Sequence, residues 1–474
     1  MSENQAKKLY ETVIANGYCV GCGACAVLED SPFKMSMNKI GQYEAEVNDP
    51  NIIVHTSTKV EEVCPFSSKS LNEDQLGKSL FESSCNHDSS VGYYQKSYAG
   101  HVKEGNFRDK GSSGGFGSWV LYELLESGKV DYIINVQPSP KGAGNSEGTL
   151  FTYTICSSIE EIQSGSKSRY YPIELSGVME QVRRQPGRYA VVGLPCFIKS
   201  VRLLQNKDAV LAERIRFCVG LVCGHLKSAR YAQSLAWQSG IVPSKLEFID
   251  FRIKSKTEAA NRYSTLSATN NNEKIIPTNQ LFGTDWGMGA FKYKACDFCD
   301  DVFAETADIV LGDAWLPQYV HDGAGTNILI LRNNEIHELI ISAKNEGRLI
   351  LDELPIEQAK ASQDAGLRHR KGGLGYRLTV EQENNVWIPT KRVAPNSAIC
   401  SSYEKKRQDL RIKLRQLSHS SFQRALDAND LNIYLNEMNP VYKEYKSIKG
   451  SYWERCYNFF KRVKGFIRRR LSRY

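Results

Sequence analysis

Four cysteines near the start of the chain constrain its fold more than any other sequence feature. Three stand in a C-x2-C-x2-C run within YCVGCGACAVLED, and the fourth precedes Pro65. Gly21 and Gly23 allow the backbone between these thiols to turn tightly around a compact inorganic core and to direct N–H groups at its sulfurs. A triple run with a remote Cys-Pro is typical of a 4Fe-4S cluster of the ferredoxin type. The first cysteine set is Cys19, Cys22, Cys25 and Cys64.

The departures from a two-cluster ferredoxin strengthen this interpretation. In such proteins the Cys-Pro of one motif ligates the other cluster. Here the first motif has no Cys-Pro of its own, because Ala26 follows Cys25, and the second motif is reduced to Cys64-Pro65. What remains is the complete ligand set of one cluster. Zinc and disulfides are the alternatives, although structural zinc usually takes two separated C-x2-C knuckles.

A second cysteine set follows later in the chain. Two members come directly after apolar stretches that indicate buried strands, and two form a C-x2-C in KACDFCDD. Strand ends meet at one edge of an α/β sheet, so these thiols are expected to converge on a second 4Fe-4S cluster or a zinc ion. On spacing alone, Cys218 is an alternative to Cys223. The second set is Cys196, Cys223, Cys296 and Cys299.

The overall pattern predicts an α/β (α+β) core with additions at both ends. We expect a ferredoxin-like module in residues 1–72, a polar linker in 73–95, the α/β domain in 96–395 and a helical basic extension in 396–474. The polar start is followed by no apolar segment, which predicts no secretory signal and a cytoplasmic protein. In that compartment thirteen cysteines, an odd number, favour metal or redox centres over disulfides.

Within 96–395 the periodicity separates strands from helices. Apolar stretches at Tyr132–Val136 and Tyr189–Val192 indicate buried strands, whereas 116–126 and 226–239 have helical spacing. A loop of small residues, Gly111-Ser112-Ser113-Gly114-Gly115, precedes the first of these helices. Small residues at a helix start allow a phosphate to approach backbone N–H groups. A flexible loop that merely caps the helix is the alternative.

The positive charge of the chain is concentrated in its last residues. The formal net charge is +8, but residues 441–474 hold 11 Lys or Arg against two Glu and so carry +9. The body is therefore nearly neutral, and no nucleic-acid partner is expected. Residues 451–474 have the pattern of a basic amphipathic helix. This predicts peripheral contact with the inner face of a membrane, with a protein contact or a nucleic-acid tail as alternatives. The apolar positions are Trp453, Tyr457, Phe460, Val463, Ile467 and Leu471.

The order of these motifs over residues 15–335 resembles the coenzyme F420 hydrogenase/dehydrogenase beta-subunit family. The matching pieces are CVGCGAC, KGSSGGFGSWVLYELLESGKVDYIINV, GSKSRYYP, VGLPCFIKSVRLL, GLVCGHLKS and CDFCDDVFAETADIVLGDAW. The resemblance implies an FAD site in the α/β domain and a cluster on the second cysteine set, with Cys223 preferred because Gly224 follows it. It also assigns Ser168, Arg169 and Tyr170 to the flavin site and makes Asp313 a candidate proton donor.

Together these features predict an iron–sulfur flavoprotein oxidoreductase with two 4Fe-4S clusters and FAD. Electrons are expected to come from reduced ferredoxin or an F420-type donor and to reach a small-molecule or lipid-linked substrate. The basic tail suggests cell-surface polysaccharide precursors as one substrate class. One alternative is a non-catalytic electron-transfer subunit that passes electrons to a partner enzyme. The other is an interaction protein whose fold is held together by structural zinc.

Overall fold

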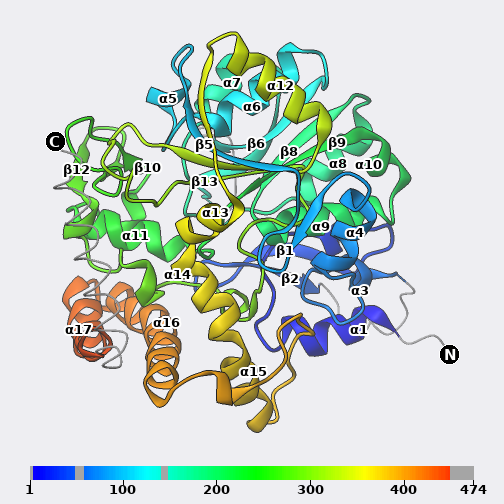
Figure 1. Ribbon diagram of the computed structural model, residues 1–474. Helices are drawn as coiled ribbons and strands as arrows, with labels where there is room; N and C mark the ends of the chain where they lie inside the picture. Colours follow the sequence, from blue (N-terminus) through cyan, green and yellow to red (C-terminus); the bar gives the residue numbers. More distant parts are fainter. Residues whose placement is uncertain (1–3, 48–57, 140–147, 449–474) are drawn as a thin grey trace.

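A mixed β-sheet forms the centre of the molecule (Figure 1). The computed structural model describes residues 4–47, 58–139 and 148–448. The sheet has eight strands in the order β15-β5-β14-β13-β9-β8-β6-β7, and β13, β9, β8 and β6 are parallel neighbours. The strands are β5 (Lys96–Val102), β6 (Tyr132–Pro138), β7 (Phe151–Cys156), β8 (Tyr189–Gly193), β9 (Ile215–Leu221), β13 (Ile309–Asp313), β14 (Asn327–Leu331) and β15 (Leu349–Glu353).

Helices cover both faces of this sheet, which explains why its central strands are apolar throughout. Ile133 and Ile134 are neighbours in β6, yet they belong to the two separate apolar cores on opposite faces. One face carries α5 (Phe107–Lys110), α6 (Phe116–Glu126), α7 (Ile159–Ser164) and α12 (Asn334–Asn345). The other carries α8 (Ser176–Arg184), α9 (Pro195–Gln205) and α10 (Ala209–Arg214). The predicted helix at 116–126 and both predicted strands are confirmed.

The described part of residues 4–72 packs against the α9 side of the sheet. It contains short helices around one β-hairpin, and its buried side chains continue the core on that face. Figure 1 shows this segment, in blue, below the sheet. The elements are α1 (Gln5–Leu9), η1 (Tyr10–Ile14), α2 (Ala24–Val27), β1 (Phe33–Met37), β2 (Tyr43–Val47) and α3 (Val60–Val63).

The interpretation of residues 73–95 as a linker is wrong. The segment forms α4 (Glu73–Phe81) and the hairpin of β3 (Asn86–Asp88) and β4 (Gly92–Tyr94). Asn72 begins the helix with a reciprocal capping box, in which its side chain accepts from the Gln75 N–H and the Gln75 side chain accepts from the Asn72 N–H, both at 2.9 Å. Polar composition alone therefore concealed a capped, packed helix.

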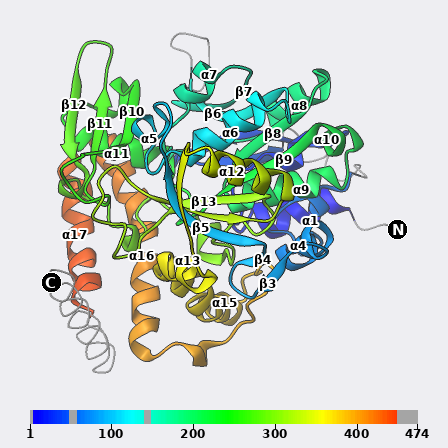
Figure 2. The ribbon, with the colours of Figure 1, turned by 45° about the horizontal axis from the view of Figure 1, so that its top comes forward.

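A second, smaller sheet extends beside the α11 helix (Figure 2). Its strands β11 and β12 pair as an antiparallel hairpin. The predicted helix at 226–239 is present as α11 and begins three residues later. The elements are α11 (Ala229–Gln238), η3 (Pro243–Lys245), β10 (Phe248–Ile253), β11 (Ser264–Ala268), β12 (Glu273–Pro277), η4 (Thr278–Gln280), η5 (Trp286–Met288) and η6 (Lys294–Phe298).

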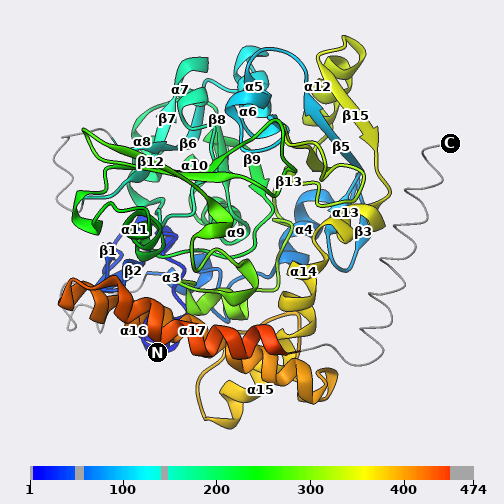
Figure 3. The ribbon, with the colours of Figure 1, turned by 90° about the vertical axis from the view of Figure 1, so that its left-hand side faces the viewer.

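The last described segment is helical, as predicted, and packs along the lower side of the molecule (Figure 3). Two long helices, α16 (Ser402–Ala428) and α17 (Leu431–Ser447), are joined by a turn at Asn429 and lie side by side. Before them come α13 (Ile356–Ser362), α14 (Asp364–Leu367), η7 (Arg368–Gly372), α15 (Leu374–Glu383) and η8 (Ser397–Ile399).

The predicted amphipathic helix at 451–474 lies outside the described residues, so membrane contact through the tail, and the polysaccharide hypothesis that rested on it, remain predictions. Among the helices of the described ranges, none combines the length and apolar character needed to cross a bilayer.

The capping box predicts a measurable local effect of Asn72→Ala. Loss of the cap should weaken α4 by about 1 kcal/mol, which corresponds to about fivefold faster exchange of its amides. Hydrogen–deuterium exchange of peptides from 73–81 measures this. Asn72→Ser, which keeps a capping oxygen, is the control and should exchange like the parent. Equal exchange in all three proteins would show that the cap contributes nothing.

Candidate functional site

The first cysteine set lines one apolar cavity. All four cysteines border it together with side chains from η1 and β1, such as Val13 and Met35. Burial, with a smaller contribution from neighbouring thiols, raises the pKa of the Cys22 thiol to about 12 and that of Cys25 well above its ordinary value. Four neighbouring cysteines, two buried and two half-buried, favour a bound metal centre, because ligation replaces protons that burial otherwise holds in place.

Backbone N–H groups are directed at these sulfurs, as the glycines in the motif predicted. The Gly21 N–H donates to Cys19 Sγ at 3.4 Å, and the Ala24 N–H interacts with Cys22. Gly21 and Gly23 both have left-handed backbone, with φ of 69° and 86°. A Cβ on Gly21 would lie 2.4 Å from the carbonyl oxygen of Tyr43, so only glycine fits there.

The second cysteine set comes together from three separate places in the chain. Cys196 lies in the first turn of α9, Cys223 follows β9, Cys296 lies within η6 and Cys299 directly follows it. The pKa of Cys196 is raised well above its ordinary value, first by burial and then by the thiols of Cys299, Cys223 and Cys296. The Leu226 N–H donates to Cys296 Sγ at 3.3 Å. The structure thus brings the four predicted thiols together.

Cys218 lies elsewhere. It is inside β9 rather than at its end, and burial raises its pKa to about 12, with Arg202 and Asp308 as the nearest charges. The Cys218 N–H donates to Asp308 Oδ2 at 2.7 Å. The geometry therefore favours Cys223 over Cys218 as the fourth member of the second set.

Helix α9 lies between the two sets. Its first turn supplies Cys196, and one turn later the Ser200 side chain hydrogen-bonds to Cys22. The Cys22 thiol also helps to raise the pKa of the Cys196 thiol. Burial and then both of these thiols raise the pKa of Tyr153. The two sets are therefore neighbours within one core.

Neither set has the arrangement of a site for one metal ion. Across the described ranges, no three His, Cys, Asp or Glu side chains form a group that could hold a metal ion. The ligands of a cluster each bind a different iron, so they are spaced more widely than the ligands of a single zinc ion.

An arginine that the sequence did not single out contacts the second set. Arg370, in η7, is buried and donates from Nη1 to Cys299 Sγ at 2.7 Å and from Nη2 to Cys223 Sγ at 3.5 Å. No short motif marks this residue, because it follows Cys299 by 71 positions. A positive charge therefore lies directly against two of the four thiols.

A buried carboxylate ties the C-x2-C turn to the C-terminal helices. Asp297 lies between the two cysteines of the turn and pairs with Lys292 and with Arg415 of α16. Burial by itself would raise the pKa of Asp297. The Lys292 charge, a hydrogen bond from His369 and the Arg415 charge instead hold that pKa well below its ordinary value. The carboxylate thus stays ionised and keeps its partners in place.

The predicted phosphate loop meets the predicted Ser-Arg-Tyr segment. The Ser168 N–H donates to Ser112 Oγ at 2.9 Å. A Cβ on Gly114 would lie 2.7 Å from the carbonyl oxygen of Gly100. Gly115 has a φ of 95° and precedes α6. The loop is thus closely packed at the helix start.

Cations surround this loop. Lys254 Nζ donates to the carbonyls of Ser113 and Ala324, both at 3.0 Å, and to that of Arg108. Burial, followed by nearby positive charges, lowers the Lys254 pKa to about 8. Burial also lowers the pKa of Arg169 to about 10, and Nε and Nη1 of Arg169 are buried without a hydrogen-bond partner. This concentration of positive charge suits an anionic ligand.

Aromatic rings connect this region with the second cysteine set. The Tyr170 ring lies 4.8 Å from that of Trp286, and Trp286 lies 4.4 Å from the His225 ring, measured between centroids. His225 follows Cys223 by two residues, and burial lowers its pKa well below the ordinary value. Trp286 is a further residue that sequence reasoning missed, since a lone tryptophan carries no motif.

The candidate proton donor Asp313 is held in an ion pair. Its carboxylate accepts from Arg252 at 2.8 Å and 3.3 Å, at the end of β13. Another acidic residue of the same segment, Asp308, pairs with Arg202. These contacts give the carboxylates structural partners, and a catalytic role for Asp313 remains a prediction.

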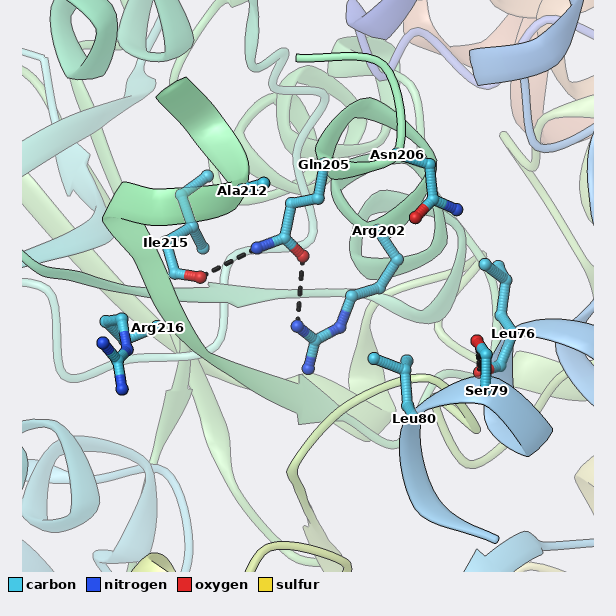
Figure 4. A pocket seen from close by; sticks show the side chains of 9 residues that line it. All are labelled: Leu76, Ser79, Leu80, Arg202, Gln205, Asn206, Ala212, Ile215 and Arg216. Atoms are coloured by element: carbon cyan, nitrogen blue, oxygen red, sulfur yellow. Dashed lines mark hydrogen bonds between the residues drawn. The ribbon is translucent and has the colours of Figure 1, made fainter. Parts of the chain in front are cut away.

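A separate surface hollow of about 320 Å³ lies between α4, α9 and α10 (Figure 4). Gln205 bridges its wall by accepting from Arg202 Nη1 at 3.1 Å and donating to the Ile215 carbonyl at 2.8 Å. None of the predicted site residues lines it. The hollow is therefore distinct from both cysteine sets and from the loop.

Two sequence families match the part of the chain that carries the loop and the second cysteine set. The coenzyme F420 hydrogenase/dehydrogenase beta subunit N-terminal family matches residues 97–180, and the corresponding C-terminal family matches 187–357. The chain belongs to the coenzyme F420 hydrogenase/dehydrogenase beta-subunit family. This confirms the resemblance. The matches begin at residue 97, so the ferredoxin-like module remains a prediction.

Individual relatives of this beta-subunit family member are distant. The coenzyme F420-dependent sulfite reductase of Methanocaldococcus jannaschii is 24% identical over an alignment of 342 residues, which covers 68% of this chain and 46% of that protein. The chain thus spans about half the length of this curated relative. A chain of the F420-reducing NiFe hydrogenase complex from Methanosarcina barkeri has a TM-score of 0.47 and 18% identity, covering 66% of this chain and 100% of that one.

The lowered pKa of Lys254 predicts a specific pH dependence of stability. Its native pKa is about 8, against an ordinary value of 10.5, so between these pH values the unfolded state binds more protons. Stability of the parent should therefore rise with pH across this window relative to Lys254→Met. Thermal unfolding from about pH 8 to about pH 10 measures the difference. Lys256→Met, at a side chain 78% exposed, is the control, and parallel curves for the parent and Lys254→Met would contradict the assignment.

Proposed function

We propose that the chain is an iron–sulfur flavoprotein oxidoreductase with two 4Fe-4S clusters and FAD. The observation that carries the proposal is the pair of four-thiol sets on either side of α9, joined by the interaction of Cys22 with Cys196. The N–H donors to Cys19 and Cys296 fit anionic sulfur ligands. When bound, the clusters would carry single electrons and the flavin would combine two of them.

The cationic loop at 111–115 supports the flavin part of the proposal. A diphosphate requires small residues, a helix start and positive charge, and the loop supplies all three through Gly114, α6 and Lys254. Tyr170 and Trp286 extend from this loop toward Cys223 and would border the flavin ring. The chain's own residues thus provide a continuous route from the first set, through the second, to the loop.

The electron donor in this proposal is reduced ferredoxin or an F420-type deazaflavin, and the acceptor is a small-molecule or lipid-linked substrate. The second candidate is a relay subunit without a substrate of its own. It is favoured by the two matching families, both of which are named for a beta subunit and so for one component of an assembly. Copurification of other subunits with the tagged full chain separates the two candidates.

Cysteine substitutions test the two clusters. Cys22→Ser and Cys296→Ser should each remove about half of the iron and acid-labile sulfide from anaerobically purified protein, because each set holds one cluster. Cys218→Ser is the matched control, a buried cysteine outside both sets, and should keep all of the iron. Zinc in place of iron, or iron unchanged in Cys296→Ser, would contradict the proposal.

Glycine substitutions test the flavin loop. Gly114→Ala places a methyl group 2.7 Å from the Gly100 carbonyl oxygen, so the loop must shift. Bound flavin should fall roughly tenfold while iron is retained, because the backbone N–H groups no longer meet the diphosphate. Gly117→Ala is the control, because nothing lies within 4 Å of its added Cβ and alanine suits the helix interior. Flavin content after gel filtration is the measurement. Equal flavin in both variants would place the cofactor elsewhere.

A further inference from the structure

Arg370 makes an unusual set of contacts for a buried arginine. Its side chain is 1% exposed, and its two terminal nitrogens reach the sulfurs of Cys299 and Cys223. The same nitrogens donate to the carbonyls of Asp301 at 2.5 Å and Gly224 at 2.7 Å. Backbone on both sides of the second cysteine set therefore fixes the plane of the guanidinium, which remains charged.

The segment that supplies this arginine lies beyond the matched family region, which ends at residue 357. It is anchored to the C-x2-C turn independently of Arg370. Arg377 Nε donates to the Asp297 carbonyl at 2.7 Å, and Arg415 Nε lies 2.8 Å from Asp297 Oδ2. The C-terminal helices thus hold Arg370 against the sulfurs as part of a packed framework.

We propose that Arg370 is a positioning residue that raises the reduction potential of the cluster held by the second cysteine set. This inference rests on the proposed function. Reduction adds one electron, taken from the reduced donor, and makes the sulfurs more negative, while no proton moves at Arg370. N–H···S hydrogen bonds and a buried positive charge stabilise that reduced state more than the oxidised one. Their removal should therefore make the cluster harder to reduce.

Potentiometric titration of the whole protein with dithionite, followed by electron paramagnetic resonance, tests the proposal. The signal lost in Cys296→Ser identifies the second cluster, and the remaining signal is an internal reference. Arg370→Gln should lower the reduced-to-oxidised ratio of the second cluster about tenfold at fixed potential, a shift of about 59 mV for one electron. Arg370→Lys keeps the positive charge but loses the two-pronged set of guanidinium N–H donors. It should therefore shift the reduction potential of the second cluster less.

Arg368→Gln is the matched control, because this arginine is in the same turn and its side chain is 65% exposed. The second cluster of this variant should have the same reduction potential as that of the parent. A second-cluster potential in Arg370→Gln equal to that of the control would overturn the inference while leaving the proposed function intact. Loss of the second cluster from both Arg370 variants would also overturn it, since Arg370 would then be needed for assembly. Unchanged iron in Cys296→Ser would instead refute the proposed function.

Discussion

The gathering of eight buried or half-buried cysteines around α9 is the constraint on which the rest of this structure depends. Burial raises the pKa of thiols in both sets, as Cys25 and Cys196 illustrate, so that the free protein holds protons where a ligated protein would hold metal. N–H groups at the sulfurs work in the opposite direction and favour the thiolate. Both effects depend on position, because a thiol must be buried and must also face its N–H donor. Chain segments that are far apart in the sequence must therefore converge in a fixed orientation.

Charge is distributed to match this arrangement. Buried cations gather at the second cysteine set, where Arg370 faces sulfur and Asp297 pairs with Lys292 and Arg415. A second group of cations, including Lys254, surrounds the small-residue loop before α6. Both groups are shielded from water at least in part, and electrostatic interactions are stronger there than in water. The fold thus prepares two places for negative charge, one at the second cysteine set and one at the loop.

The failure at residues 73–95 has a simple physical origin. A polar composition was interpreted as a linker, yet Asn72 and Gln75 have the spacing of a capping box, which was readable in the sequence. The buried face of α4 depends on only a few apolar residues, such as Leu76 and Phe81. Local capping and tertiary packing together outweighed a composition that favours exposure.

The sequence by itself determined the elements whose information is local. The spacing of Cys19, Cys22 and Cys25, the helix at 116–126 and the buried strands follow from short-range patterns and were predicted. Only the tertiary structure placed Cys218 beside Arg202 and Asp308, brought Ser112 to Ser168, and set Cys22 beside Cys196. It also placed Arg370 against two sulfurs. These contacts join residues distant in the chain, and they arise from packing of whole elements, which no local pattern encodes.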